Sequence, residues 1–112
     1  MHEFSLIEAV IDSIEERSRE GSWGRITKVT LKIGEMRQVI PEILQFSFSV
    51  ASKGSSMEGA ELVIIELALE KRCRSCGNSW KGSASRCTSC GCDDTETVSG
   101  MELEIESVEV EE

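Results

Sequence analysis

Residues 71–92 read KRCRSCGNSWKGSASRCTSCGC, and this stretch divides the chain into a cysteine-rich insertion and the segments that flank it. Its cysteines follow the pattern C-x2-C-x10-C-x2-C. Each C-x2-C pair can form a turn that directs both of its sulfurs to one side. Two such turns can direct four sulfurs toward one ion, in the tetrahedral arrangement that zinc accepts. A closed site of four thiolates leaves no position for water, so the sequence predicts a structural zinc ion bound by Cys73, Cys76, Cys87 and Cys90.

Two other interpretations of the cysteines are weaker. A disulfide framework is disfavoured by the odd number of cysteines, five, and by the cytoplasmic location expected below. A redox dithiol would not need a second C-x2-C pair. Cys92 is left over, and its C-G-C spacing leaves open an exchange with Cys90 as the fourth ligand. The five basic residues of the insertion are expected mainly to offset the charge of the thiolates.

The segments around the insertion predict strands. Residues 61–69, ELVIIELAL, form a nearly continuous apolar run, which is typical of a central strand buried on both faces. Residues 25–34 alternate apolar and polar side chains, as half-buried strands do. Residues 101–110 alternate in the same way until the apolar phase flips at Val108, which indicates a bulge near Ser107. The two strands that flank the insertion are expected to pair antiparallel, with the insertion projecting from them.

Two helices complete the predicted fold. Ser5 and Glu8 fit a capping box, and apolar residues then recur at helical spacing, which predicts a helix over residues 6–20. Its charged outer face is interpreted as solvated, and this face contains Glu8, Asp12, Glu15, Glu16 and Arg19. Pro41 suits the first turn of a second helix that ends before Gly54, with Phe46 in the core. The predicted fold class is α+β, a small mixed three-stranded sheet packed with two helices, plus an inserted four-cysteine zinc ribbon.

Composition and charge exclude several function classes. The chain has 112 residues, of which 39% are hydrophobic, and a net charge of -9. All 21 acidic residues lie outside residues 71–92, so most of the surface should repel nucleic acid. No segment approaches the roughly 20 apolar residues of a membrane span, and Glu3 and Glu8 stand where a signal peptide would be basic. We therefore expect a cytoplasmic protein that binds neither membrane nor nucleic acid.

The chain begins MHE, and His2 is its only histidine. A histidine at a terminus is usually part of a solvated, frayed end. With Met1 retained, however, the terminal amine and the His2 amide close a five-membered chelate ring, and the same amide and the imidazole close a six-membered one. Glu3 lies within reach as a further donor. Nitrogen-rich planar donor sets of this kind suit Ni(II) or Cu(II), so a metal site at the N-terminus is a second hypothesis.

The start MHEFSL, the stretch VIPEILQFSFSVASKGSSMEGAELVI, the paired C-x2-C ribbon and the closing GMELEIESVEV together resemble the hydrogenase nickel-incorporation family HypA, over essentially the whole chain. The resemblance implies a nickel metallochaperone. Nickel would be bound by the Met1 amine, His2 and neighbouring backbone amides, with Glu3 supporting the site. It also implies a nickel domain formed by residues 1–70 and 99–112 and a separate zinc domain at residues 71–98.

The same resemblance implies partners. HypA-like proteins act with the GTPase HypB and deliver nickel to the large subunit of [NiFe] hydrogenase, and some members also serve urease. The alternative function is a zinc-ribbon adaptor module that binds protein or nucleic acid through its basic insertion. An enzyme is not expected, because the chain has one histidine, no glycine-rich phosphate loop and no nucleophile with a plausible base.

Overall fold

The structure is a computed structural model that describes residues 2–111. The chain forms two compact units. The first comprises residues up to Leu31, Val39–Ile65 and those from Glu104 onward, and the second comprises Lys32–Gln38 and Glu66–Leu103. Along the chain the elements are α1 (His2–Gly21), β1 (Ile26–Gly34), the short 3-10 helix η1 (Glu35–Arg37), α2 (Pro41–Ala51), β2 (Glu61–Leu67), β3 (Glu70–Cys73), β4 (Ser79–Lys81), β5 (Thr95–Ser99) and β6 (Leu103–Val110).

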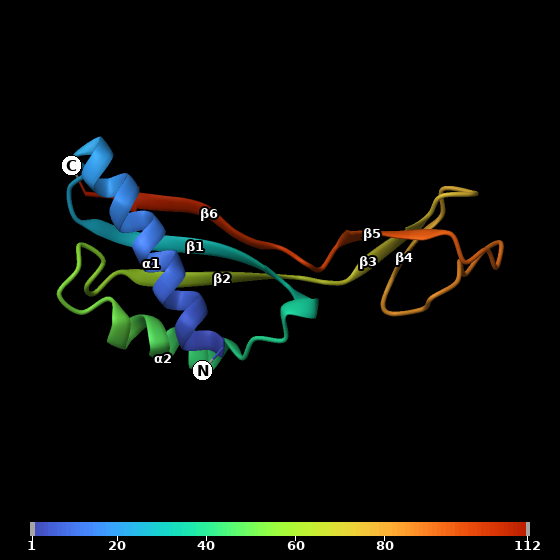
Figure 1. The fold of residues 1–112 in the computed structure, drawn as a ribbon, viewed down its shortest axis with the longest axis horizontal. Coiled ribbons are helices and arrows are strands. Elements are labelled where there is room, and N and C mark those ends of the chain that lie inside the picture. The colour runs from blue at the N-terminus through green and yellow to red at the C-terminus, as the bar shows by residue number, and fades with distance from the viewer. Residues whose placement is uncertain (1, 112) are drawn as a thin grey trace. The chain divides into compact units, whose positions relative to one another are not determined.

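The first unit contains a mixed three-stranded sheet in the order β2-β1-β6, crossed by α1 (Figure 1). Strands β1 and β2 run in the same direction, whereas β6 runs in the opposite one. The Glu111 amide donates to the Arg25 carbonyl at 2.8 Å, and the Thr27 hydroxyl donates to the Glu109 carbonyl at 3.3 Å, as expected for antiparallel neighbours. The predicted mixed sheet packed with two helices is therefore confirmed.

The central strand is β1, so the prediction that residues 61–69 form the central strand was wrong. Val29 and Leu31 of β1 are fully buried, whereas β2 lies at an edge and leaves Ile65 exposed. A continuous apolar run is typical of burial on both faces, but it does not determine which strand has two neighbours. Strand β1 also buries the polar residue Thr30, because β1 has a hydrogen-bonded strand on each side.

The expected pairing of the two strands that flank the insertion was also wrong within this sheet. Strands β2 and β6 each neighbour β1 and not each other. The strands next to the cysteine pairs do pair antiparallel in the second unit, where β3 lies between β4 and β5. Lys71 is paired with Thr97 of β5 and with Trp80 of β4. The insertion is therefore a small three-stranded sheet of its own.

Helix α1 begins at His2 and not at residue 6, so the predicted capping box is absent and Ser5 lies inside the helix. The buried face of α1 extends back to Glu3, one turn before the apolar residues Leu6 and Ile7. Glu3 accepts a hydrogen bond from the backbone of Ile40, and this contact holds the first turn in place. Interaction with a distant segment thus overrides the local capping signal.

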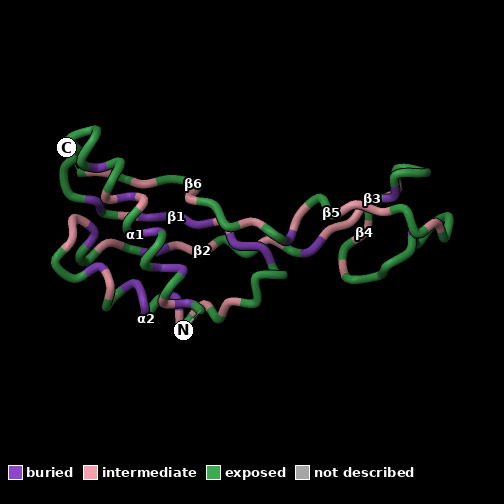
Figure 2. Tube along the Cα trace, in the orientation of Figure 1, coloured by how far each residue is buried: buried purple, intermediate pink, exposed green. Residues whose placement is uncertain are grey.

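Helix α2 begins with Pro41 and buries Leu44 and Phe48. Figure 2 shows buried and exposed segments alternating along α2. The prediction that Phe46 lies in the core was wrong, because 69% of Phe46 is exposed. Two residues along an α-helix correspond to a rotation of about 200°, so Phe46 points away from the side that carries Leu44 and Phe48. Among the described residues, no helix is both long and apolar enough to cross a membrane.

Candidate metal sites

The insertion brings its two cysteine pairs together. The four sulfur atoms all lie within 4.8 Å of one another, and they belong to Cys73, Cys76, Cys87 and Cys90. The Cys73 and Cys90 sulfurs are 3.6 Å apart, and the Cys76 and Cys87 sulfurs are 3.5 Å apart. A tetrahedral zinc ion with Zn–S distances of about 2.3 Å requires sulfur–sulfur separations of about 3.8 Å. The cluster therefore fits zinc, and it is consistent with the predicted four-cysteine zinc ribbon.

Each cysteine pair is held in a turn of the same form. The Gly77 amide donates to the Cys73 carbonyl at 2.9 Å, and the Gly91 amide donates to the Cys87 carbonyl at 3.0 Å. Gly77 and Gly91 have φ values of 80° and 77°, in the left-handed region that glycine adopts without a steric penalty. The glycine after each pair therefore lets the chain turn back sharply.

Backbone amides also point at the sulfurs. The Cys76 amide donates to the Cys73 sulfur at 3.4 Å, and the amides of Ser89 and Cys90 each donate to the Cys87 sulfur at 3.3 Å. The Cys90 amide, and then the Ser89 amide, lower the pKa of the Cys87 thiol to about 6, against the effect of burial. Such bonds favour the thiolate, which is the form that binds metal.

Cys92 is not part of the cluster, which contains Cys90 in the position that the sequence left open. The Cys92 carbonyl accepts from the Cys87 amide at 2.8 Å, and in the first turn the Asn78 carbonyl accepts from the Cys73 amide at the same distance. Cys92 therefore occupies the backbone position in the second turn that Asn78 occupies in the first. Its sulfur accepts from the Asp94 amide at 3.5 Å.

Two arginines of the insertion pair with carboxylates. Arg72 donates to the Glu96 carboxylate through Nε at 2.8 Å, and Arg74 lies 3.1 Å from the Asp94 carboxylate. The hydrogen bond from Arg72, and then its charge, lower the pKa of Glu96. Since Glu96 and Asp94 follow the stretch that sequence analysis treated as uniformly basic, their pairing with these arginines was not foreseen.

The insertion has almost no core apart from its cysteines. In residues 74–99, Cys87 is the one buried residue, and Trp80 is only partly covered. Small metal-binding domains without an apolar core obtain much of their folding free energy from metal binding. Cys73 and Cys87, at the cysteine cluster, are the main buried residues of the insertion.

At the other candidate site, His2 and Glu3 lie in the first turn of α1. His2 is exposed, whereas Glu3 is 9% exposed, and its carboxylate accepts from the Ile40 amide at 3.2 Å. Met1, the third residue of the predicted nickel site, lies outside the described residues. The first amides of an α-helix have no acceptor within the helix, so the backbone N–H groups near His2 have none from α1 itself.

Sequence reasoning missed Ile40 as the partner of Glu3. The two residues are 37 positions apart, and the contact uses a backbone amide, so no side-chain pattern reveals it. The contact gives Glu3 a positioning role: it joins the start of α1 to the residue that precedes α2.

Replacing Glu3 with alanine should therefore destabilise the first turn of α1. The change leaves the Ile40 amide without its carboxylate acceptor, which should lower the free energy of unfolding by about 1–3 kcal/mol. Glu3→Gln keeps an oxygen acceptor and should cost less. Urea unfolding and hydrogen exchange of the Ile40 amide measure both effects. Equal stability of the alanine variant and the unmodified protein would show that this hydrogen bond contributes nothing.

Comparison with known proteins identifies the family to which this two-part chain belongs. The family described as "Hydrogenase/urease nickel incorporation, metallochaperone, hypA" matches residues 1–110. Hydrogenase maturation factor HypA of Chlorobaculum tepidum is 35% identical over 99% of this chain and 100% of its own length. The HypA of Streptomyces avermitilis is 38% identical over 100% of this chain and 88% of its own length.

Solved structures show the same fold. The solution structure of the nickel metallochaperone HypA from Helicobacter pylori matches with a TM-score of 0.69 and 24% identity, over 98% of this chain and 97% of that one. The family model and the curated relatives define the class as metallochaperone-type maturation factors. The chain belongs to the HypA family of hydrogenase maturation and nickel incorporation.

Proposed function

We propose that the protein is a nickel metallochaperone for the maturation of [NiFe] hydrogenase, and that Ni(II) is bound at the N-terminus by the Met1 amine, His2 and adjacent backbone amides. Glu3 supports this site by fixing the start of α1. The observation that carries the proposal is the exposed His2 in the first turn of a helix, in a chain that belongs to the HypA family over residues 1–110. The first-turn amides make no hydrogen bond within the helix, so an amide nitrogen that binds nickel can release its proton to solvent without breaking a helical bond.

The proposal requires a local change in α1. A planar chelate that includes the His2 amide and imidazole constrains the backbone at His2, which then leaves helical geometry. The cost is small, because terminal residues of a helix fray readily. Glu3 stays bonded to Ile40 and limits the unwinding to His2.

Donor chemistry keeps the two metals apart. The nitrogen donors at the N-terminus suit nickel, and the soft thiolates of Cys73, Cys76, Cys87 and Cys90 suit zinc. We assign nickel binding to residues 1–70 and 99–112 and structural zinc to residues 71–98. The exposed nickel site releases its ion to a partner, whereas the zinc ion stays in place.

The proposed partners are the GTPase HypB and the large subunit of [NiFe] hydrogenase, and urease maturation proteins are further candidates. The proposed compartment is the cytoplasm, where thiols stay reduced and available to zinc. The protein carries metal and performs no catalysis of its own. The description of the family as one of hydrogenase and urease nickel incorporation supports the assignment of hydrogenase-related and urease-related partners.

X-ray absorption spectroscopy of the protein with a native N-terminus, loaded with both metals, tests the proposal. Nickel is expected to show nitrogen and oxygen neighbours only, and zinc to show four sulfurs. Each metal should be present at close to one equivalent per chain. Nickel surrounded by sulfur would overturn the N-terminal assignment, because it would place the transferable ion in the ribbon.

The adaptor alternative has less support. Two of the arginines that made the insertion appear basic, Arg72 and Arg74, are paired with carboxylates of the same unit. Phosphate recognition depends on basic side chains that can reach the nucleic acid backbone. The paired arginines therefore reduce the positive charge that a nucleic-acid partner would meet.

A further inference from the structure

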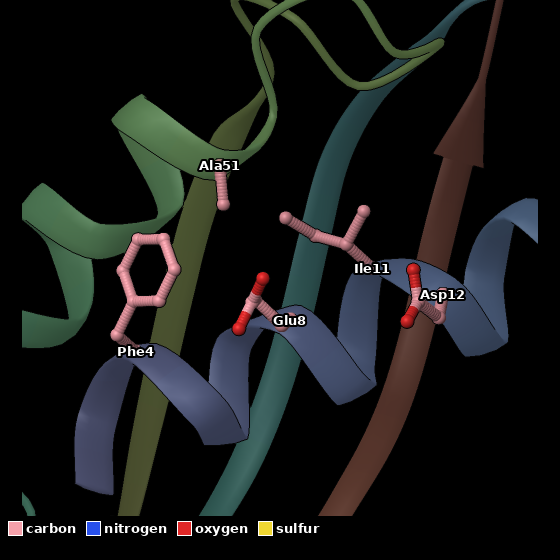
Figure 3. Close-up of a pocket in the computed structure, with 5 residues that line it drawn as sticks. All are labelled: Phe4, Glu8, Ile11, Asp12 and Ala51. Atoms are coloured by element: carbon pink, nitrogen blue, oxygen red, sulfur yellow. The ribbon is translucent and has the colours of Figure 1, made fainter. Parts of the chain in front are cut away.

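A groove of about 140 Å³ lies between α1 and α2 in the first unit. Figure 3 shows the Phe4 ring, the Glu8 carboxylate and the Ile11 side chain along α1, with Ala51 facing them from α2 and Asp12 further along α1. Pockets for drug-sized ligands measure about 300–1,000 Å³. This groove is too small for such a ligand, but its size suits one inserted side chain.

The groove is acidic and has no cation of its own. Glu8 and Asp12 are one turn apart on α1, both are exposed, and no lysine or arginine lines the groove. Within residues 2–111 neither carboxylate has a hydrogen-bond or ion-pair partner. Glu15, on the same side of α1, differs: its carboxylate accepts from the Ser56 amide at 3.0 Å and the Ser56 hydroxyl at 2.6 Å. Glu15 is therefore committed to the fold, whereas Glu8 and Asp12 are available to a ligand.

We propose that this groove binds an arginine side chain presented by a partner protein. A guanidinium group can donate to both carboxylates and stack on the Phe4 ring at the same time. The aliphatic part of the arginine would pack on Ile11 and Ala51. The combination of an aromatic ring, two aliphatic side chains and two unpaired carboxylates matches arginine in shape and in charge.

The position of the groove connects it with metal delivery. Phe4 is two residues after His2 on α1, so a partner anchored in the groove would lie beside the N-terminal end of the helix. This connection rests on the proposed nickel function. Arginine recognition itself is independent of the nickel function, because none of the groove residues belongs to the proposed nickel site.

Titration of the ¹⁵N-labelled, nickel-free full chain with N-acetyl-arginine amide tests the proposal by NMR. Saturable shifts are expected at the amides of Phe4, Glu8 and Ala51, with a dissociation constant on the order of 10 mM for a single residue. The citrulline analogue has the same shape without the charge and should cause no saturable shift. Binding of the citrulline analogue with equal affinity would overturn the proposal.

Variants of the full chain complete the test. Glu8→Gln combined with Asp12→Asn should weaken arginine binding at least about tenfold, because both charge-assisted hydrogen bonds are lost. The matched control is Glu16→Gln combined with Glu20→Gln, which removes two charges from exposed residues of α1 that do not line the groove. An equal loss with this control would show that only the general negative charge of α1 attracts the ligand. Since nickel is absent throughout, failure here is distinct from failure of the nickel proposal.

Discussion

Replacing Cys87 with serine is expected to abolish zinc binding and to unfold the insertion while the first unit stays folded. The change removes one of four ligands, together with the sulfur that accepts bonds from the Ser89 and Cys90 amides. Structural zinc in small peptides contributes an apparent binding free energy of about 10–16 kcal/mol at neutral pH. With Cys87 the one buried residue among residues 74–99, no apolar core can replace that contribution.

Zinc content and NMR spectra measure this result. Zinc should fall from about one equivalent per chain to near zero, and the amide signals of β3, β4 and β5 should collapse to random-coil positions. Signals of Leu44 and Phe48, in the core of the first unit, should keep their dispersion. Cys92→Ser is the matched control and should retain zinc, because Cys92 lies outside the cluster. Loss of zinc in this control, or its retention in Cys87→Ser, would contradict the ligand assignment.

The cysteine cluster could be predicted from sequence because its geometry is local. Two residues between the members of each pair, and a glycine after each pair, are enough to form a turn that directs both sulfurs to one side. The interchange between Cys90 and Cys92 could not be settled in this way, because both follow Cys87 closely. The structure separates them by the hydrogen bond from the Cys87 amide to the Cys92 carbonyl.

The arrangement of the sheet could be predicted only in part. The three strands of the first unit were recognised from their side-chain patterns, but their order depends on which strand has two bonded neighbours. The apolar run of β2 suggested a central position, yet β1 holds it. Phe46 shows the same limit in α2: hydrophobicity alone does not place a residue in the core when its helical phase directs it outward.

The acidic side chains of α1 illustrate why sites are harder to predict than elements. Glu8, Asp12 and Glu15 all belonged to the face interpreted as solvated. One of them bonds a loop 41 residues away, and the other two line a groove completed by Ala51. The spacing of Phe4, Glu8 and Asp12 at every fourth position was a signal that these side chains share one side of the helix. Only the packing of α2 makes that side a groove.

The proposed nickel site leads to the second large effect. His2→Ala should lower the nickel affinity at least about 100-fold, because it removes the imidazole and the six-membered chelate ring. A Gly-Ser-Gly-Ser extension before Met1 keeps the imidazole but converts the terminal amine into a peptide nitrogen, so it should have an effect of similar size. In both variants zinc should stay near one equivalent, since the cysteine cluster belongs to the other unit.

Isothermal titration with nickel, combined with zinc analysis of the same samples, measures these effects. The two variants act on different atoms, so together they distinguish a chelate from a simple imidazole site. If His2 alone bound nickel, the extended protein would keep its affinity, and the amine would have no role. If nickel bound the ribbon, both variants would titrate like the unmodified protein. The chelate proposal requires both variants to lose nickel affinity, while the far-UV circular dichroism of the protein stays unchanged.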